Sequence, residues 1–190
     1  SYVVLGAGFF TTQKSQEVVH TSVSQTSSSM EVVGDVIGIG IAGAGSTAAN
    51  IASVKITLGL SAGGGAVDFN KIVVTYADQD TVQTLDKTAA LTVAAGKVFE
   101  PTNEWGADGL ANAAAGKWHI CDMMNADDYT ASDVGVLMEP REQFVITAGL
   151  PEGGIGPNHK FTIEIKPSVG SSLGVVRTSP AQIDLINRLY

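Results

Sequence analysis

A short acidic segment is the first candidate for chemistry in this sequence. Asn125, Asp127 and Asp128 lie close together in the stretch 122–128 and offer a cluster of oxygen ligands. Hard cations such as calcium prefer ligands of this type, so these residues are a candidate metal site. Their spacing matches no specific metal-binding loop, and a solvated acidic loop explains them better. The sequence thus suggests no required cofactor, with a divalent cation such as calcium as the one to test.

The single cysteine and the three histidines are the candidates for nucleophilic chemistry. Cys121 follows His119 by two residues, which puts both on one face of a predicted strand. A reactive thiol needs an exposed, electropositive setting, and the neighbouring Asp122 is acidic. His20 and His159 lie in no recognised nucleophile motif. We therefore expect a packed thiol beside a half-exposed imidazole, and a single cysteine excludes an intrachain disulfide.

The segment 38–43 fits the dinucleotide-binding pattern G-x-G-x-x-G. In a dinucleotide fold these glycines open the helix of a βαβ unit. Here Ile37, Ile39 and Ile41 alternate with the glycines, which indicates that a strand continues through the motif. The sequence therefore predicts no catalytic residues, no cofactor-binding glycines, no small-molecule substrate and no enzymatic activity.

The N-terminal residues have a different chemistry, which is that of assembly. The stretch 1–10 is uncharged and apolar on nearly every side, and too short to span a bilayer, which needs roughly 20 apolar residues. In aqueous solution the apolar surface of such a helix must be shielded from water, and packing against copies of the same helix would do this. The alternatives are packing on its own domain or service as the stub of a membrane anchor. The predicted assembly interface consists of Tyr2, Val3, Val4, Leu5, Phe9 and Phe10.

The helical pattern ends in a hydroxyl-rich segment at 24–29, where side chains compete for backbone hydrogen bonds. We therefore predict two parts, an N-terminal assembly helix and hinge over 1–28 and a globular domain over 29–190. Because the chain opens within an apolar stretch and without Met, we expect the first part of the helix to be missing.

From the hinge onward the apolar period is two, which indicates half-buried strands. In the stretch 160–166, Phe161, Ile163 and Ile165 alternate with Lys, Thr and Glu residues. Glycine-rich and proline-rich turns separate the strands at short intervals. The fold class is therefore mainly β, an antiparallel immunoglobulin-like β-sandwich preceded by an N-terminal α-helix. The stretches 100–114 and 122–133 follow neither period, and we expect both to be long surface loops. Further strands are expected around 37–41, 54–60, 72–76, 134–138 and 144–146.

The net charge of the chain limits the classes of partner that it is expected to bind. With 19 acidic and 11 basic residues the net charge is −8, and a chain of this sign is repelled by phosphate backbones and anionic membranes. Nucleic acid is therefore not an expected partner.

Three groups of residues resemble the archaellins, or archaeal flagellins. Residues 1–17 (SYVVLGAGFFTTQKSQE) are similar to the end of the archaellin assembly helix in methanogens. Residues 161–170 (FTIEIKPSVG) with 174–180 (GVVRTSP) resemble the terminal strand pair, and 67–76 (VDFNKIVVTY) is similar to a strand in the middle of the domain.

The resemblance implies a structural subunit of the extracellular swimming filament, the archaellum. Such a subunit is made as a pilin-like precursor, cleaved by a dedicated peptidase, and assembled through bundled N-terminal helices with β-sandwich domains outside. Its implied partners are copies of itself, other archaellins and proteins of the filament base. Some archaellins bind a metal ion in the globular domain. The alternative function is a membrane-anchored β-sandwich binding module or a motor-associated component of the same machinery.

Overall fold

The computed structural model describes residues 30–42, 48–88, 113–126 and 137–190. Every regular element in these ranges is a β-strand, and none of these residues forms a helix able to cross a membrane. The mainly β fold class is confirmed, while the helix predicted over the first 28 residues lies outside the described ranges.

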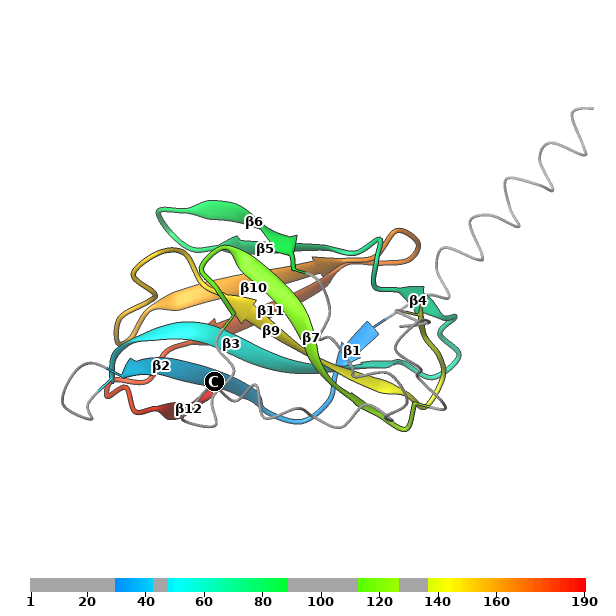
Figure 1. The fold of residues 1–190 in the computed structure, drawn as a ribbon, viewed down its shortest axis with the longest axis horizontal. Helices are drawn as coiled ribbons and strands as arrows, with labels where there is room; N and C mark the ends of the chain where they lie inside the picture. Colours follow the sequence, from blue (N-terminus) through cyan, green and yellow to red (C-terminus); the bar gives the residue numbers. More distant parts are fainter. Residues whose placement is uncertain (1–29, 43–47, 89–112, 127–136) are drawn as a thin grey trace, which may run out of the picture.

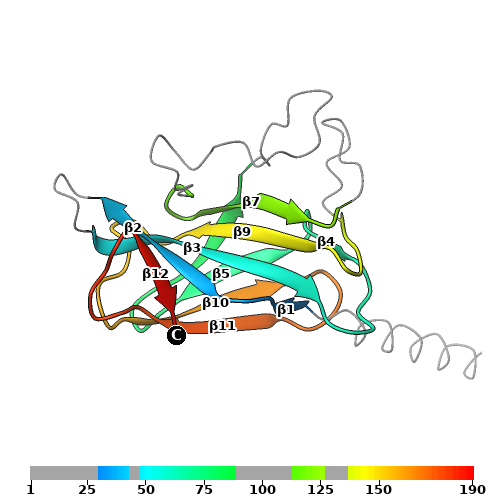
Figure 2. The ribbon, with the colours of Figure 1, turned by 90° about the horizontal axis from the view of Figure 1, so that it is seen from below.

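The strands form two layers (Figures 1 and 2). The first sheet has the order β7-β9-β3-β2-β12, with β1 paired to the end of β3. The second sheet has the order β6-β5-β10-β11. The bounds of the first sheet are β7 Lys117–Met124, β9 Gln143–Gly149, β3 Ala48–Leu60, β2 Val36–Ala42, β12 Ile186–Leu189 and β1 Met30–Val32. Those of the second are β6 Val82–Lys87, β5 Val73–Ala77, β10 Lys160–Lys166 and β11 Leu173–Thr178.

Two short pairings complete the topology. Strands β6 and β7 run parallel where Asp86 and Lys87 face Lys117 and Trp118, and this link joins the two layers at one side. Strands β4 (Val67–Asp68) and β8 (Leu137–Met138) form a separate antiparallel pair. All the other strand pairings are antiparallel, as half-buried alternating strands require.

The core lies between the layers and follows the alternation of the sequence. In β10, Phe161, Ile163 and Ile165 are buried, and Lys160 and Glu164 are exposed. Aromatic rings fill the middle of the core, and Phe69 and Phe144 pack with ring centroids 4.9 Å apart. Burial of each large apolar side chain contributes about 1.5–3 kcal/mol. The largest fully buried side chains are Trp118, Tyr76, Phe69, Phe144, Phe161, Ile39, Ile51, Ile56, Leu58, Ile120, Met138 and Ile146.

Strand β2 presents Gly38 to the core. A Cβ atom on Gly38 would lie 3.0 Å from Ile51 Cδ1 and from Leu189 Cδ2, which are both core side chains. Ile37 and Ile39 lie on the opposite side of β2, where both line a pocket with Ile186 of β12, and Ile39 is buried there although it is not part of the core between the layers. The first sheet therefore carries an apolar strip on the side that faces away from the core.

Two expectations about local structure are wrong. The stretch 67–76 is not one strand, because a turn separates β4 from β5. The Lys71 N–H donates to Asp68 O at 3.0 Å, and the Asn70 N–H donates to the Asp68 carboxylate at 2.9 Å. The expected loop over 122–133 also begins too early, since Asp122–Met124 belong to β7. An irregularity at Cys121 shifts the register between Ile120 and Asp122, and this hides the period of two.

Candidate functional site

The N-terminal end of the described chain enters the sandwich through β1. Met30 is buried in the core and pairs with Leu60, and the Val33 N–H donates to Thr57 O at 2.9 Å. The predicted assembly residues, Tyr2, Val3, Val4, Leu5, Phe9 and Phe10, lie outside the described residues. Strand β1 therefore fixes the place where the preceding segment joins the domain, and the division at residues 28 and 29 stays a prediction.

A surface hollow of about 500 Å³ lies beside this junction. Glu31 and Leu60 line it from β1 and β3, and Pro140 and Arg141 line it from the turn before β9. Arg141 has a φ of 80°, and its carbonyl accepts a hydrogen bond of 3.3 Å from Asn125 Nδ2. The amide of Asn125 thus ties the end of β7 to this turn.

Asn125 is one of the predicted cation ligands, and in the structure its side-chain amide hydrogen-bonds to the turn before β9. Asp127 and Asp128 lie outside the described residues, so the structure does not test the predicted ligand set. Among the described residues, no three His, Cys, Asp or Glu side chains are grouped so as to hold a metal ion. The calcium site stays a prediction.

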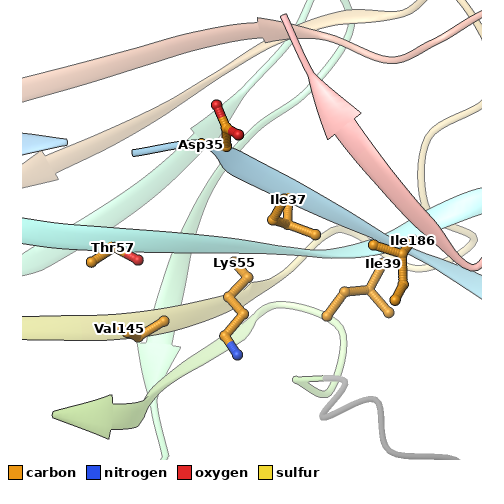
Figure 3. Close-up of a pocket in the computed structure, with 7 residues that line it drawn as sticks. All are labelled: Asp35, Ile37, Ile39, Lys55, Thr57, Val145 and Ile186. Carbon is orange, nitrogen blue, oxygen red and sulfur yellow. The ribbon is translucent and has the colours of Figure 1, made fainter. Parts of the chain in front are cut away.

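The outer face of the first sheet carries an apolar pocket, which we call the outer pocket (Figure 3). Its volume is about 320 Å³. Ile37 and Ile39 come from β2, and Ile186 comes from β12, where it pairs with Ile39 and is 59% exposed. Lys55 and Asp35 add one charge of each sign. The complete lining is Asp35, Ile37, Ile39, Lys55, Thr57, Val145 and Ile186. Ile39 and Val145 in this lining are themselves buried, and Asp35 is paired with Arg188 at 2.6 Å.

A hydrogen-bonded cluster around Asp78 joins the β5–β6 turn to the start of β10. Tyr76 Oη donates to Asp78 Oδ2 at 2.5 Å, and His159 Nε2 lies 3.0 Å from the same oxygen. The N–H groups of Asp80 and Thr81 donate to Asp78 Oδ1 at 2.9 and 2.7 Å. Only 10% of the Asp78 side chain is exposed. Four donors around one buried carboxylate favour its charged form.

The pKa values follow from these contacts. Burial raises the pKa of Asp78, but the hydrogen bonds from Tyr76, from the backbone of Asp80 and Thr81, and from His159 outweigh it and hold the pKa at about 2. For Tyr76, burial and the bonded Asp78 carboxylate both raise the pKa of the phenol. Sequence reasoning missed this cluster. The only local signal was the turn-forming stretch 78–81, because His159 lies far away in the chain.

The contribution of this cluster to stability can be tested by comparing the unfolding free energy of Asp78→Asn with that of the parent at several pH values. The pKa of Asp78 is depressed in the folded chain, so its contribution is fully present above the ordinary Asp value near 3.8 and is lost as the pH falls through about 2. We expect the variant to lose roughly 1–2 kcal/mol of unfolding free energy at pH 6, and the difference from the parent to shrink towards pH 2. Urea unfolding at several pH values measures this. Asp80→Asn, at an exposed position of the same turn, is the control, and an equal loss at pH 2 and pH 6 would contradict the prediction.

Among the residues that the structure describes, the candidates for catalysis do not form a site, and His20 lies outside them. Cys121 and His119 are both half-buried in β7, and burial raises the pKa of the Cys121 thiol, which makes it a poor nucleophile. Gly38 and Gly40 lie inside β2, which runs antiparallel to β3 and β12. They do not open a helix of a βαβ unit, so the dinucleotide hypothesis fails for the reason given by the alternating isoleucines.

Known proteins are similar to this chain in both sequence and fold. Residues 1–177 match the family model described as archaeal-type flagellin. The chain is 35% identical to probable flagellin 1 of Archaeoglobus fulgidus over 188 residues, which cover 97% of this chain and 81% of the relative. It is 29% identical to probable flagellin 2 of the same organism, over 95% of this chain and 79% of the relative.

Two solved structures have a similar fold. One is the archaeal flagellum of Methanospirillum hungatei strain JF1, with a TM-score of 0.61 and 22% identity over 100% of this chain and 87% of that one. The other is the crystal structure of archaeal flagellin FlaB1 from Methanocaldococcus jannaschii, with a TM-score of 0.60 and 14% identity over 84% of this chain and 95% of that one.

Proposed function

The chain belongs to the archaeal-type flagellin family, and we propose that it polymerises by burying the apolar residues of its N-terminal segment against copies of itself. As a member of this family it is a structural subunit of the archaellum, the extracellular swimming filament of archaea, and not an enzyme. Its partners in the filament are further flagellin copies.

One observation carries the proposal for the interface. The family match begins at residue 1 and includes the whole stretch 1–10, so the apolar segment is part of what makes this chain a flagellin. Burial of Tyr2, Leu5, Phe9 and the other apolar residues would contribute roughly 1.5–3 kcal/mol per large side chain, before the entropic cost of association. Summed over several residues, this term is large enough to drive assembly.

The described domain supports separate roles for the N-terminal segment and the β-sandwich. Strand β1 is paired with β3, and its first residue, Met30, is buried, so the segment 1–28 joins the sandwich at its first strand. We propose that residues 1–28 form the assembly helix and hinge, and that residues 29–190 form the domain on the filament exterior. Torque is then transmitted along the bundled helices, with the sandwich domains as a solvated acidic coat.

Filaments sheared from the cells that make this protein test the function. We expect mass spectrometry of the purified filaments to find this chain, and gold-labelled antibodies against it to decorate them in the electron microscope. The matched sample is the cell-envelope fraction left after shearing. Detection in the envelope only, with undecorated filaments, would support the membrane-anchored binding module instead.

A further inference from the structure

A lysine and an asparagine are in contact beside the link between the two sheets. Lys87 Nζ donates to Asn70 Oδ1 at 2.7 Å. Lys87 ends β6, where it pairs with Trp118 of β7, and Asn70 lies in the turn between β4 and β5. An amine and a carboxamide can condense to a new amide with loss of ammonia. The contact thus places a nucleophilic nitrogen against the carbonyl group that it would attack.

The backbone holds both residues in place. The Asn70 N–H donates to Asp68 Oδ1 at 2.9 Å, which fixes the turn. On the other side, Lys87 is held by the parallel pairing with Trp118, and the N–H of the next residue, Thr88, donates to Trp118 O at 2.9 Å. Two reacting groups held together in this way react far faster than the same groups free in solution.

The amine of Lys87 is partly removed from water. Its Nζ lies 5.6 Å from the centroid of the buried Trp118 ring. Burial lowers the pKa of Lys87, and the Asp68 carboxylate opposes this shift only in part. A lowered pKa increases the share of neutral amine, which is the nucleophilic form. Lys71 differs in both respects, because its side chain is 68% exposed and its partner is the Asp68 carboxylate, which resists attack by an amine.

We propose that Lys87 and Asn70 form an isopeptide crosslink in this chain. The Lys87 nitrogen bonds to the side-chain carbonyl carbon of Asn70, and the bond from that carbon to the amide nitrogen breaks. The amide nitrogen keeps the electron pair, takes the proton that the amine loses, and leaves as ammonia. Asp68 bonds the Asn70 backbone and interacts with the Lys87 charge, so its carboxylate is placed to carry that proton.

The crosslink would tie the β4–β5 turn to the end of β6, next to the short parallel pairing that joins the layers. The reaction consumes no oxidant and no cofactor. Since the single cysteine allows no intrachain disulfide, this bond gives an extracellular subunit a covalent tie that reducing agents do not break.

Mass spectrometry of the 190-residue chain tests the crosslink. We expect an intact mass about 17 Da below that of the sequence, which is the mass of one ammonia. Trypsin cleaves after Lys71 but not after a modified Lys87, so the two residues should appear in one branched peptide made of 56–71 and 72–97. Lys87→Arg keeps the charge but removes the nucleophilic amine. It should have the full mass of its sequence and give separate peptides.

Lys71→Arg is the matched control, because Lys71 adjoins Asn70 in the chain but bonds to a carboxylate. It should lose ammonia as the parent does and give the same branched peptide. Closure of Asn70 onto its own backbone also releases ammonia but leaves the two peptides separate. A lighter chain without the branched peptide would therefore overturn the proposal, and so would a parent chain with the full mass of its sequence.

Discussion

Replacing both Phe9 and Phe10 with Asp is expected to abolish filament formation by the full-length subunit. Both positions lie in the stretch that is apolar on nearly every side. Each substitution removes roughly 1.5–3 kcal/mol of apolar burial, and it also places a carboxylate where helices bundle without water, at a cost of several kcal/mol per charge. Because the same change recurs in every subunit along the polymer, the loss is multiplied. Negative-stain electron microscopy under assembly conditions that include a divalent cation should show only dispersed particles.

Ser15→Asp with Gln16→Asp is the matched control. It adds the same two charges to the same segment, but in its polar part, where only Val18, Val19 and Val23 form a thin apolar stripe. Filaments should persist in this control. Filaments from the Phe9 and Phe10 variant would refute the proposed interface. Dispersed particles from the unchanged subunit, under the same conditions, would favour the membrane-anchored binding module.

The strands that were predictable from sequence are those with one wet face and one buried face. In β10, charged or hydroxyl residues alternate with Phe161, Ile163 and Ile165, so the sequence alone fixes both the strand and the side that faces the core. Strand β2 was predictable as a strand only. Its inward side depends on Ile51 and Leu189, which come from β3 and β12 and fill the space over Gly38. Which face of β2 is buried is therefore decided by distant parts of the chain.

Local irregularities limited the prediction elsewhere. The bulge at Cys121 in β7 and the turn at Asp68 each shift the alternation within a single apolar stretch. The Asp78 cluster was beyond local reasoning for a different reason. Its partner His159 is 81 residues away, and only the antiparallel pairing of β5 with β10 brings the two together. Sequence patterns report burial along one strand, whereas such clusters depend on which strands become neighbours.

Replacing Gly149 with Ala is expected to destabilise the domain strongly, because two backbone segments approach each other closely at this residue. At the end of β9, a Cβ atom on Gly149 would lie 2.1 Å from Ala114 O and 2.8 Å from Ala113 O. Both atoms belong to the backbone of the turn 113–116, so no side chain can rotate away to make room. The turn is held in place by the Gly116 N–H, which donates to Gly149 O at 3.2 Å. Gly149→Ala must therefore displace the turn itself.

The same turn holds the two sheets together. The Asp86 N–H at the end of β6 donates to Gly116 O at 3.0 Å, next to the short parallel pairing of β6 with β7. Displacing the turn thus strains the link between the layers as well as the end of β9. Overpacking of a core usually costs about 1–3 kcal/mol, and we expect Gly149→Ala to cost at least about 3 kcal/mol because the clash is with backbone.

Urea unfolding of the 190-residue chain, followed by circular dichroism, measures this loss. The matched control is Gly174→Ala in the edge strand β11, where a Cβ atom would meet nothing within 4 Å. Because glycine within a strand is destabilising by roughly 0.5–1 kcal/mol relative to alanine, the control should unfold at the same urea concentration as the parent or a higher one. Equal midpoints for Gly149→Ala and the parent would show that the turn 113–116 yields without cost, and that the link between the sheets does not depend on its position.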